Sequence, residues 1–297
     1  KLLKKVNQLT ESDLDQRANR WISAIEECNE VSENKIHALD LYSGAHWKVA
    51  KGLTSKLNSN NWGPKLWILS AGYGLLNEHS KLVSYNAAFS TGKEDSIFPK
   101  NFTKNHAQAS REYRLNWWEK LQNINAGKEL DSKSLSELGS KDHKSKFLIA
   151  CSTPYLQAIS LDIKSIKNFE ERVFLITQPI GDNQLEACRV GTTIDRPYSD
   201  LKTYTYGQFG TNSHPGAFTG SMMSLNVQIA DHLLSFSDRH NFSRKELNTE
   251  FEELIGKCPK RPKIKKNYPK GKTIAEQEEF IRRDIQLYLK LVTKLRE

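Results

Sequence analysis

Three short apolar runs constrain the fold of this chain most strongly. They are residues 66–69 (LWIL), 147–150 (FLIA) and 173–176 (VFLI). Each is followed by polar or turn-forming residues, which is typical of a buried β-strand. Segments of helical character lie between the runs, and strands that alternate with helices indicate an α/β protein. The sequence therefore predicts a three-layer α/β sandwich with a central, largely parallel sheet.

Helices are expected on both sides of these strands. The first begins near Thr10 and Asp13, which have the spacing of a capping pair, and runs to about Cys28. Further helices are predicted at 45–57, 102–124, 154–159, 221–234 and 243–256, with a last charged helix at 273–297. A short segment at 36–41 is the remaining expected element.

The composition divides the chain into two predicted parts. Residues 1–236 contain the strands and form an α/β core. Within this core, 127–146 is rich in Lys, Ser, Asp and Glu, has little to bury, and is predicted to be a mobile insertion. Residues 237–297 are predicted to be a basic helical C-terminal extension. Its run at 257–272 holds eight basic residues and no acidic ones.

The formal net charge of +9 and the pI of about 9.2 favour polyanionic partners, with nucleic acid first and an anionic membrane surface second. The basic run supplies candidate contacts to a DNA backbone. A solvated tail is the plainer alternative for the same run. The candidate backbone contacts are Lys260, Arg261, Lys263, Lys265 and Lys266.

Cysteine spacing and hydropathy exclude several classes of protein. The four cysteines lie far apart with no CxxC pair, so we expect a reduced, cytoplasmic protein with no metal site and no cofactor. No apolar stretch approaches the roughly 20 residues that span a bilayer, and no signal peptide is expected. The sequence begins at Lys1, so whether a strand precedes it stays open, as does the oligomeric state.

Four loops carry the candidate site residues, and each adjoins a predicted element. Glycine-containing loops after strands are where α/β proteins bind ligands, and helix N-termini that follow such loops suit phosphate. In chain order the candidates are Asp40, Tyr42, Ser43 and Gly44; Ser70, Gly72, Tyr73, Gly74, Tyr85 and Asn86; Ser152; and His214, Gly220, Ser221 and Asn226.

Each candidate also has a purely structural alternative. The two glycines at 72 and 74 fit a simple turn, which is the better interpretation when they are taken alone. The tyrosines fit core residues with satisfied hydroxyl groups, and His46 fits a neutral core histidine. Asp40 and Ser221 fit helix caps, and His214 fits an ordinary loop residue.

Taken together, the segments LYSGAHWKVA, LWILSAGYGLL and SYNAAF resemble a bacterial family related to the peroxide-stress protein YaaA. That family typically shows an "LYtG" segment, a strand ending "SAkyGLl" and a following "pY". GSMMSLNVQIADHLL resembles the helix that closes the core of related domains, some of which accompany deazaguanine transglycosylases. The resemblance covers roughly residues 36–235. Its central motif is fairly specific, and the others are weak.

Related domains resemble the uracil-DNA glycosylase fold, and His214-Pro-Gly is faintly similar to the His-Pro-Ser loop of those enzymes. The nearest likeness is to antiphage DNA glycosylases that excise glucosylated hydroxymethylcytosine. Two features depart from the pattern. An opening Cys-Ser strand is not seen, and Asn86 stands where relatives often have an acid after the tyrosine.

The resemblance implies a DNA glycosylase that extrudes a modified base from double-stranded DNA and leaves an abasic site. Under this hypothesis Asp40 stabilises charge or activates water, Asn86 positions water, and His214 assists the leaving base. Tyr73 or Tyr85 stacks on the base. Two alternatives stay open, which are a YaaA-like DNA-binding protein without chemistry and a nucleoside or nucleotide N-glycosidic hydrolase or transferase. Nucleotide approach is assigned to the Gly72, Gly74 and Gly220 backbones, and phosphate binding to Ser221.

Overall fold

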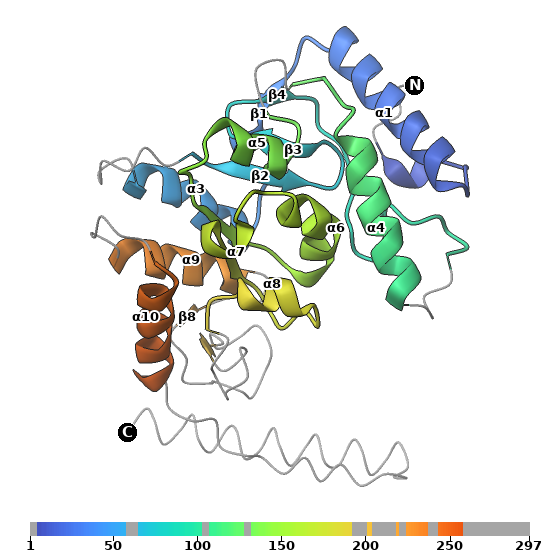
Figure 1. Cartoon of the computed structure of the whole chain (residues 1–297). Helices are drawn as coiled ribbons and strands as arrows, with labels where there is room; N and C mark the ends of the chain where they lie inside the picture. Colours follow the sequence, from blue (N-terminus) through green and yellow to red (C-terminus); the bar gives the residue numbers. More distant parts are fainter. Residues whose placement is uncertain are drawn as a thin grey trace, which may run out of the picture.

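The computed structural model describes residues 5–57, 65–102, 107–127, 132–191, 201–203, 218–219, 224–236 and 243–257. These residues form a mixed α/β structure, which confirms the predicted class (Figure 1). Their strands pair two by two, with β1 (Ile36–His37) antiparallel to β4 (Lys81–Leu82), β2 (Trp67–Ser70) antiparallel to β3 (Gly74–Asn77), β5 (Phe147–Ala150) parallel to β6 (Val173–Ile176), and β7 (Lys202–Thr203) parallel to β8 (Phe218–Thr219). A single central, largely parallel sheet is not confirmed.

The predicted helices that fall within the described residues are present with shifted ends, and helices at 6–8, 135–141, 169–172 and 183–187 were not predicted. The helix predicted at 45–57 has these bounds in the structure, and the one predicted at 102–124 covers 107–121. Asp13, and not Thr10, caps the first helix, because its carboxylate accepts a hydrogen bond of 2.9 Å from the backbone N–H of Gln16. The helices are η1 (Val6–Gln8), α1 (Leu14–Val31), α2 (Ala38–Leu41), α3 (Ala45–Leu57), α4 (Ala107–Leu121), α5 (Leu135–Lys141), α6 (Thr153–Lys164), α7 (Phe169–Arg172), α8 (Asn183–Ala187), α9 (Leu225–Phe236) and α10 (Arg244–Lys257).

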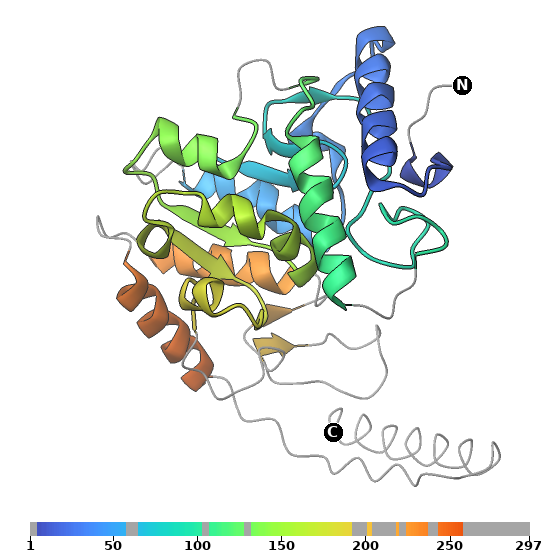
Figure 2. The same ribbon diagram turned by 45° about the vertical axis from the view of Figure 1, so that its right-hand side comes forward.

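The parallel pair β5–β6 carries a hydrophobic core on each face. Side chains alternate along a strand, so Val173 and Leu175 join the core that includes α4 and α6. Phe174 and Ile176 join a second core formed with α9 and α10. Figure 2 shows α4, α5 and α6 on one side of the strands and α9 on the other, where it also contacts α3. This burial on both faces explains why the sequence of each strand is a continuous apolar run.

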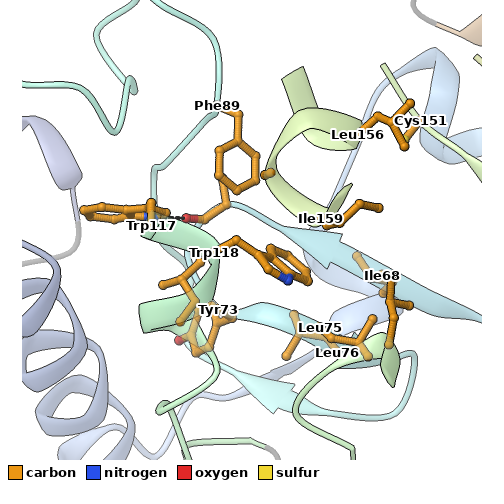
Figure 3. Packing of buried hydrophobic residues seen from close by; sticks show 14 of the residues in the cluster. Ile68, Tyr73, Leu75, Leu76, Phe89, Trp117, Trp118, Cys151, Leu156 and Ile159 are labelled. Carbon is orange, nitrogen blue, oxygen red and sulfur yellow. Dashed lines mark hydrogen bonds between the residues drawn. The ribbon is translucent and has the colours of Figure 1, made fainter. Parts of the chain in front are cut away.

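The strand at 67–70 does not lead into an open loop and a helix. The chain turns back at once into β3, which the sequence analysis did not predict, and Ser70 pairs with Gly74. Gly74 has a φ of +78°, which glycine adopts without strain. Two tryptophans from different helices fix the turn, since Trp21 Nε1 donates to the carbonyl of Gly72 (2.8 Å) and Trp117 Nε1 to that of Ala71 (2.9 Å). Figure 3 shows the α4 tryptophans among the side chains of this hairpin.

Part of the segment 127–146 is a helix, where the sequence analysis predicted a loop. The N-terminus of α5 is held by the carboxylate of Asp162, which accepts hydrogen bonds from the backbone N–H groups of Leu135 (2.8 Å) and Ser136 (2.9 Å). The buried guanidinium of Arg172 donates to the carbonyl of Gly139 at 3.1 Å. These contacts come from residues distant in sequence, so local composition does not reveal them.

The described part of the predicted extension is α10, which packs on the core. Leu247, Phe251, Leu254 and Ile255 are buried against α9 and the β5–β6 pair. Arg244 at its start donates a hydrogen bond to the carbonyl of Val173 at 2.9 Å and lies over the Phe174 ring. The basic residues that follow 257, the helix predicted at 273–297 and the boundary at 236 stay predictions. Among the helices described above, none is long and apolar enough to cross a membrane.

Candidate hydroxyl site at the strand ends

Three of the predicted site residues form a hydrogen-bonded group, which we call the hydroxyl cluster: Tyr42, Ser70 and Tyr85. The hydroxyl oxygens of Tyr42 and Tyr85 lie 2.8 Å apart, and Ser70 Oγ lies 2.5 Å from the hydroxyl oxygen of Tyr85. Tyr42 follows α2, Ser70 ends β2, and Tyr85 follows β4. The fold thus brings together polar groups from segments that are 15 to 43 residues apart in the chain.

The backbone around Ser70 orients its hydroxyl group. Ser70 Oγ accepts from the N–H groups of Gly72 (3.2 Å) and Tyr73 (3.0 Å), which occupies both lone pairs of the oxygen. The hydrogen of Ser70 is therefore donated to a phenol, and both Tyr85 and Tyr42 share a hydrogen bond with this hydroxyl. Either phenol can be the donor in the bond between Tyr42 and Tyr85. The cluster is a group of three mutually hydrogen-bonded hydroxyl groups.

Burial keeps these phenols neutral. Desolvation raises the pKa of Tyr42, and the hydrogen bonds from its neighbours offset only part of that rise. Desolvation also raises the pKa of Tyr85 well above its usual value, and the nearby Tyr42 raises it further. Both hydroxyl groups are therefore protonated at neutral pH and act as hydrogen-bond donors.

The ring of Tyr85 covers the space over Gly72. A Cβ atom at position 72 would lie 2.5 Å from Cδ2 of Tyr85, so only glycine fits beneath the ring. The Tyr85 ring therefore packs closely against Gly72, where the sequence analysis assigned the approach of a nucleotide. Tyr73 is fully buried, and its hydroxyl donates to the carbonyl of Val83 (3.2 Å) and accepts from Asn29 (2.8 Å). These contacts fit the structural alternative for Tyr73, and the positive φ of Gly74 fits the turn.

Asp40 and Asn86 lie close in sequence to the cluster, but their side chains are exposed. The Asp40 carboxylate is 61% exposed and forms an ion pair of 3.1 Å with Lys51 of α3. The backbone carbonyl of Asn86 accepts from the N–H of Val6 (3.0 Å), which places it beside the N-terminal segment. Ser43 and Gly44 are exposed just before α3, whose first turn is closed by a bond of 3.0 Å from the N–H of Lys48 to the Gly44 carbonyl.

A second group of predicted residues meets at the carboxyl end of β5. Asn226, near the start of α9, donates a hydrogen bond of 2.6 Å to the carbonyl of Cys151, and Ser152 is exposed beside it. Burial raises the pKa of Tyr155 in α6, and Tyr42, Asp95 and Cys151 add smaller contributions in the same direction. Burial raises the pKa of Cys151 to about 12, so this thiol is no nucleophile at neutral pH.

The sequence analysis missed two residues at these strand ends. Tyr155 stands in the first turn of α6, and Thr177 follows β6 directly. Both residues lie just after predicted strands, and this position was the signal that could have identified them. The burial and the hydrogen-bond partners of their side chains cannot be read from a sequence. Elsewhere in the described structure, no three His, Cys, Asp or Glu side chains are grouped as metal ligands.

Several predicted residues lie outside the described structure, and their assignments stay predictions. They are His214, Gly220, Ser221, Lys260, Arg261, Lys263, Lys265 and Lys266. Comparisons of the chain with protein-family models, with curated proteins and with solved structures gave no match.

Proposed function

We propose that the protein is a DNA N-glycosylase that excises a modified base, in the first instance glucosylated hydroxymethylcytosine, and leaves an abasic site in phage DNA. The observation that carries the proposal is the hydroxyl cluster, which gathers three hydrogen-bonded, neutral hydroxyl groups at the end of a strand. The sequence resemblance and the net charge of +9 support DNA as the partner. The proposed compartment is the cytoplasm.

We also propose the finer architecture, a three-layer sandwich around a largely parallel sheet. Its support is the β5–β6 pair, which has a helix-covered core on each face. In such a fold, ligands bind at the carboxyl ends of the strands. Ser70, Cys151 and Thr177 each stand at or directly after such an end.

The proposed chemistry follows from the charges that develop when an N-glycosidic bond breaks. The sugar becomes positive and the departing base becomes negative, so a donor aimed at the base stabilises the transition state. Tyr42 is the donor in this proposal, with Tyr85 and Ser70 holding its hydroxyl in orientation. Asp40 and Asn86, exposed beside the cluster, remain the candidates that face the sugar and the water.

The test is the formation of abasic sites in duplex DNA with and without the modified base. We expect cleavable abasic sites on the modified duplex with the wild-type chain. Tyr42→Phe should reduce the single-turnover rate by about 100-fold, which is typical for the loss of one transition-state donor. Tyr113→Phe is the matched control, because that buried hydroxyl makes only a long bond of 3.5 Å to the carbonyl of Ile97. Absence of abasic sites on every duplex would refute the proposal.

A second candidate is a DNA-binding protein without chemistry, and the Asp40–Lys51 ion pair favours it. The Asp40 carboxylate is exposed and already paired with Lys51, as an ordinary surface carboxylate is. Asp40→Asn distinguishes the candidates, because it removes the charge and keeps the shape. If the protein is a glycosylase that uses this carboxylate, the variant loses the rate of base excision and retains its affinity for DNA. If the protein only binds DNA, the variant retains the biological effect of the wild type.

A further inference from the structure

Two buried tryptophans from different helices hold the turn between β2 and β3. Trp21 of α1 and Trp117 of α4 are both fully buried. The indole N–H of Trp117 donates to the carbonyl of Ala71 (2.9 Å), 46 residues away in the chain. The indole N–H of Trp21 donates to the carbonyl of Gly72 (2.8 Å), 51 residues away. An indole N–H is a donor only, so each tryptophan fixes the direction of one carbonyl.

These carbonyls belong to the two peptide groups whose N–H groups are directed at Ser70. The first peptide group carries the Ala71 carbonyl and the Gly72 N–H, which donates to Ser70 Oγ (3.2 Å). The second carries the Gly72 carbonyl and the Tyr73 N–H, which donates to the same oxygen (3.0 Å). A trans peptide group is planar, and its C=O and N–H have opposite directions. A hydrogen bond that holds the carbonyl therefore holds the N–H as well.

The orientation of the Ser70 hydroxyl depends on these two N–H groups. Because they occupy both lone pairs of Oγ, the Ser70 hydrogen is donated to a phenol of the hydroxyl cluster. If either peptide group turns over, one lone pair is released and accepts a phenol hydrogen instead. Ser70 is 1% exposed, so bulk water does not occupy that lone pair. The hydrogen-bond direction inside the cluster thus depends on indole groups that bind only the backbone of the turn.

We propose that Trp21 and Trp117 are positioning residues, which orient the Ser70 hydroxyl through the two peptide groups of the turn and so set the hydrogen-bond direction of the hydroxyl cluster. The consequence for base excision rests on the proposed function, in which the cluster donates to the departing base. Hydrogen-bond donors that are oriented before the reaction need no reorganisation when charge develops in the transition state.

Amide hydrogen exchange of the full chain, followed residue by residue by NMR, tests each peptide group separately. Trp117→Phe removes the indole N–H and keeps a buried aromatic ring. It should increase exchange of the Gly72 N–H about tenfold relative to the amides of β2 and β3, as for the loss of one buried hydrogen bond. Trp21→Phe should increase exchange of the Tyr73 N–H by a similar factor.

Trp118→Phe is the matched control for the loss of a buried indole. Trp118 also lies in α4 and is 2% exposed, but its Nε1 donates to the carboxylate of Asp162 at 3.2 Å (Figure 3). This variant should leave both amides of the turn unchanged relative to the strands. If Trp21→Phe and Trp117→Phe change both amides equally, or change neither, the tryptophans do not hold the two peptide groups and the proposal is wrong.

The ionisation of Tyr42 supplies a second readout, because a positioning role and a space-filling role change it in opposite directions. Burial raises the pKa of Tyr42, and the hydrogen bonds with Ser70 and Tyr85 offset part of that rise. If the indole N–H groups orient Ser70, their loss removes its part of the offset and raises the pKa further. If the tryptophans only fill space, the smaller ring of phenylalanine admits water and lowers the pKa.

The probe for this readout is a difluorinated tyrosine at position 42, followed by fluorine NMR. Its phenol is more acidic than that of tyrosine, so it ionises while the chain is still folded. In this background, Trp21→Phe and Trp117→Phe should each raise the pKa of the probe, and Trp118→Phe should leave it unchanged. A lower pKa in either of the first two variants would overturn the proposal.

The rate of base excision separates this inference from the proposed function. On the modified duplex, Trp21→Phe and Trp117→Phe should each reduce the single-turnover rate about tenfold and retain DNA affinity. If the wild type forms no abasic sites, the glycosylase function fails, and exchange and ionisation still decide whether the tryptophans are positioning residues. If the wild type is active and both variants keep its rate, the function stands and the positioning inference is wrong.

Discussion

At the scale of single residues, the contact between Gly72 and Tyr85 is the most stringent feature of the site. The ring lies directly over the glycine, where any side chain would overlap it. The same ring carries the hydroxyl that joins Ser70 to Tyr42. Position 72 therefore determines whether the hydroxyl cluster can assemble, although its own backbone only forms the turn.

Gly72→Ala should destabilise the protein by about 1–3 kcal/mol, because the new methyl group displaces a buried ring. It should also abolish the activity proposed for the cluster. Gly52→Ala is the control, since nothing lies within 4 Å of a Cβ atom there and the residue is inside α3. That variant should gain about 0.5–1 kcal/mol from helix propensity. Chemical denaturation measures both, and equal stability of the two variants would contradict the packing described here.

The sequence indicated the residues of the cluster but not their geometry. Tyr42, Ser70 and Tyr85 were all candidates, because each stands beside a turn or a strand end. The orientation of the Ser70 hydroxyl depends on two backbone N–H groups that only the folded hairpin directs at it. Thr177 was missed for a similar reason, since an unpaired hydroxyl is a property of the packed interior.

At the scale of elements, one buried carboxylate connects α5 to two neighbouring helices. Asp162 accepts from two N–H groups of the first turn of α5 and also from Trp118 Nε1 at 3.2 Å. Its side chain belongs to α6, so the contact joins α4, α5 and α6. A helix of seven residues is too short to be stable by itself and depends on such contacts.

Asp162→Asn should lower the free energy of unfolding by about 1–3 kcal/mol. The Asn amide replaces one acceptor oxygen by an NH2 group, so one of the N–H donors that face this side chain loses its acceptor. Hydrogen exchange should rise first in α5. Asp15→Asn is the matched control, since its carboxylate is 63% exposed and pairs only with Lys120 on the surface, so the change should be under about 1 kcal/mol. Unchanged exchange in α5 for Asp162→Asn would show that other contacts suffice.

Helices and strands with a clear apolar run or periodicity were predictable from the sequence. Those stabilised by residues far away in the sequence were not. The strands at 147–150 and 173–176 and the helix at 45–57 have the predicted bounds, because apolar runs and periodicity identify them locally. The strand β3 was missed since its four residues follow a turn whose reversal is fixed by Trp21 and Trp117. The helix α5 was missed because Asp162 and Arg172 stabilise it from elsewhere in the chain.

At the scale of the whole molecule, buried phenols and thiols make stability sensitive to alkaline pH. Desolvation raises the pKa of Tyr113 to about 12, and burial raises that of Cys151 to about 12, with Tyr42, Tyr73, Tyr85 and Tyr155 raised as well. A group whose pKa is higher in the folded chain stabilises the fold fully below its unfolded pKa. That contribution is lost as the pH rises through the folded value.

The free energy of unfolding should therefore fall above about pH 9, where unfolded thiols and then phenols begin to ionise. Each group contributes up to about 1.4 kcal/mol per pH unit between its unfolded and folded pKa values. Urea denaturation between pH 8 and about 11 measures the slope. Tyr85→Phe should have a shallower slope than the wild type, and an equal slope would show that Tyr85 ionises as readily in the folded chain as in the unfolded one.

The last prediction concerns how charge is distributed along the chain. The net charge of +9 is close to the eight basic residues of 257–272, so that run should dominate DNA binding. Five Lys or Arg→Gln changes in it should reduce the slope of log affinity against log salt by up to about 0.9 per lost phosphate contact. An equal loss from five scattered lysines would show that only net charge matters. The run is changed at Lys260, Arg261, Lys263, Lys265 and Lys266, and the control at the exposed Lys35, Lys48, Lys93, Lys100 and Lys144.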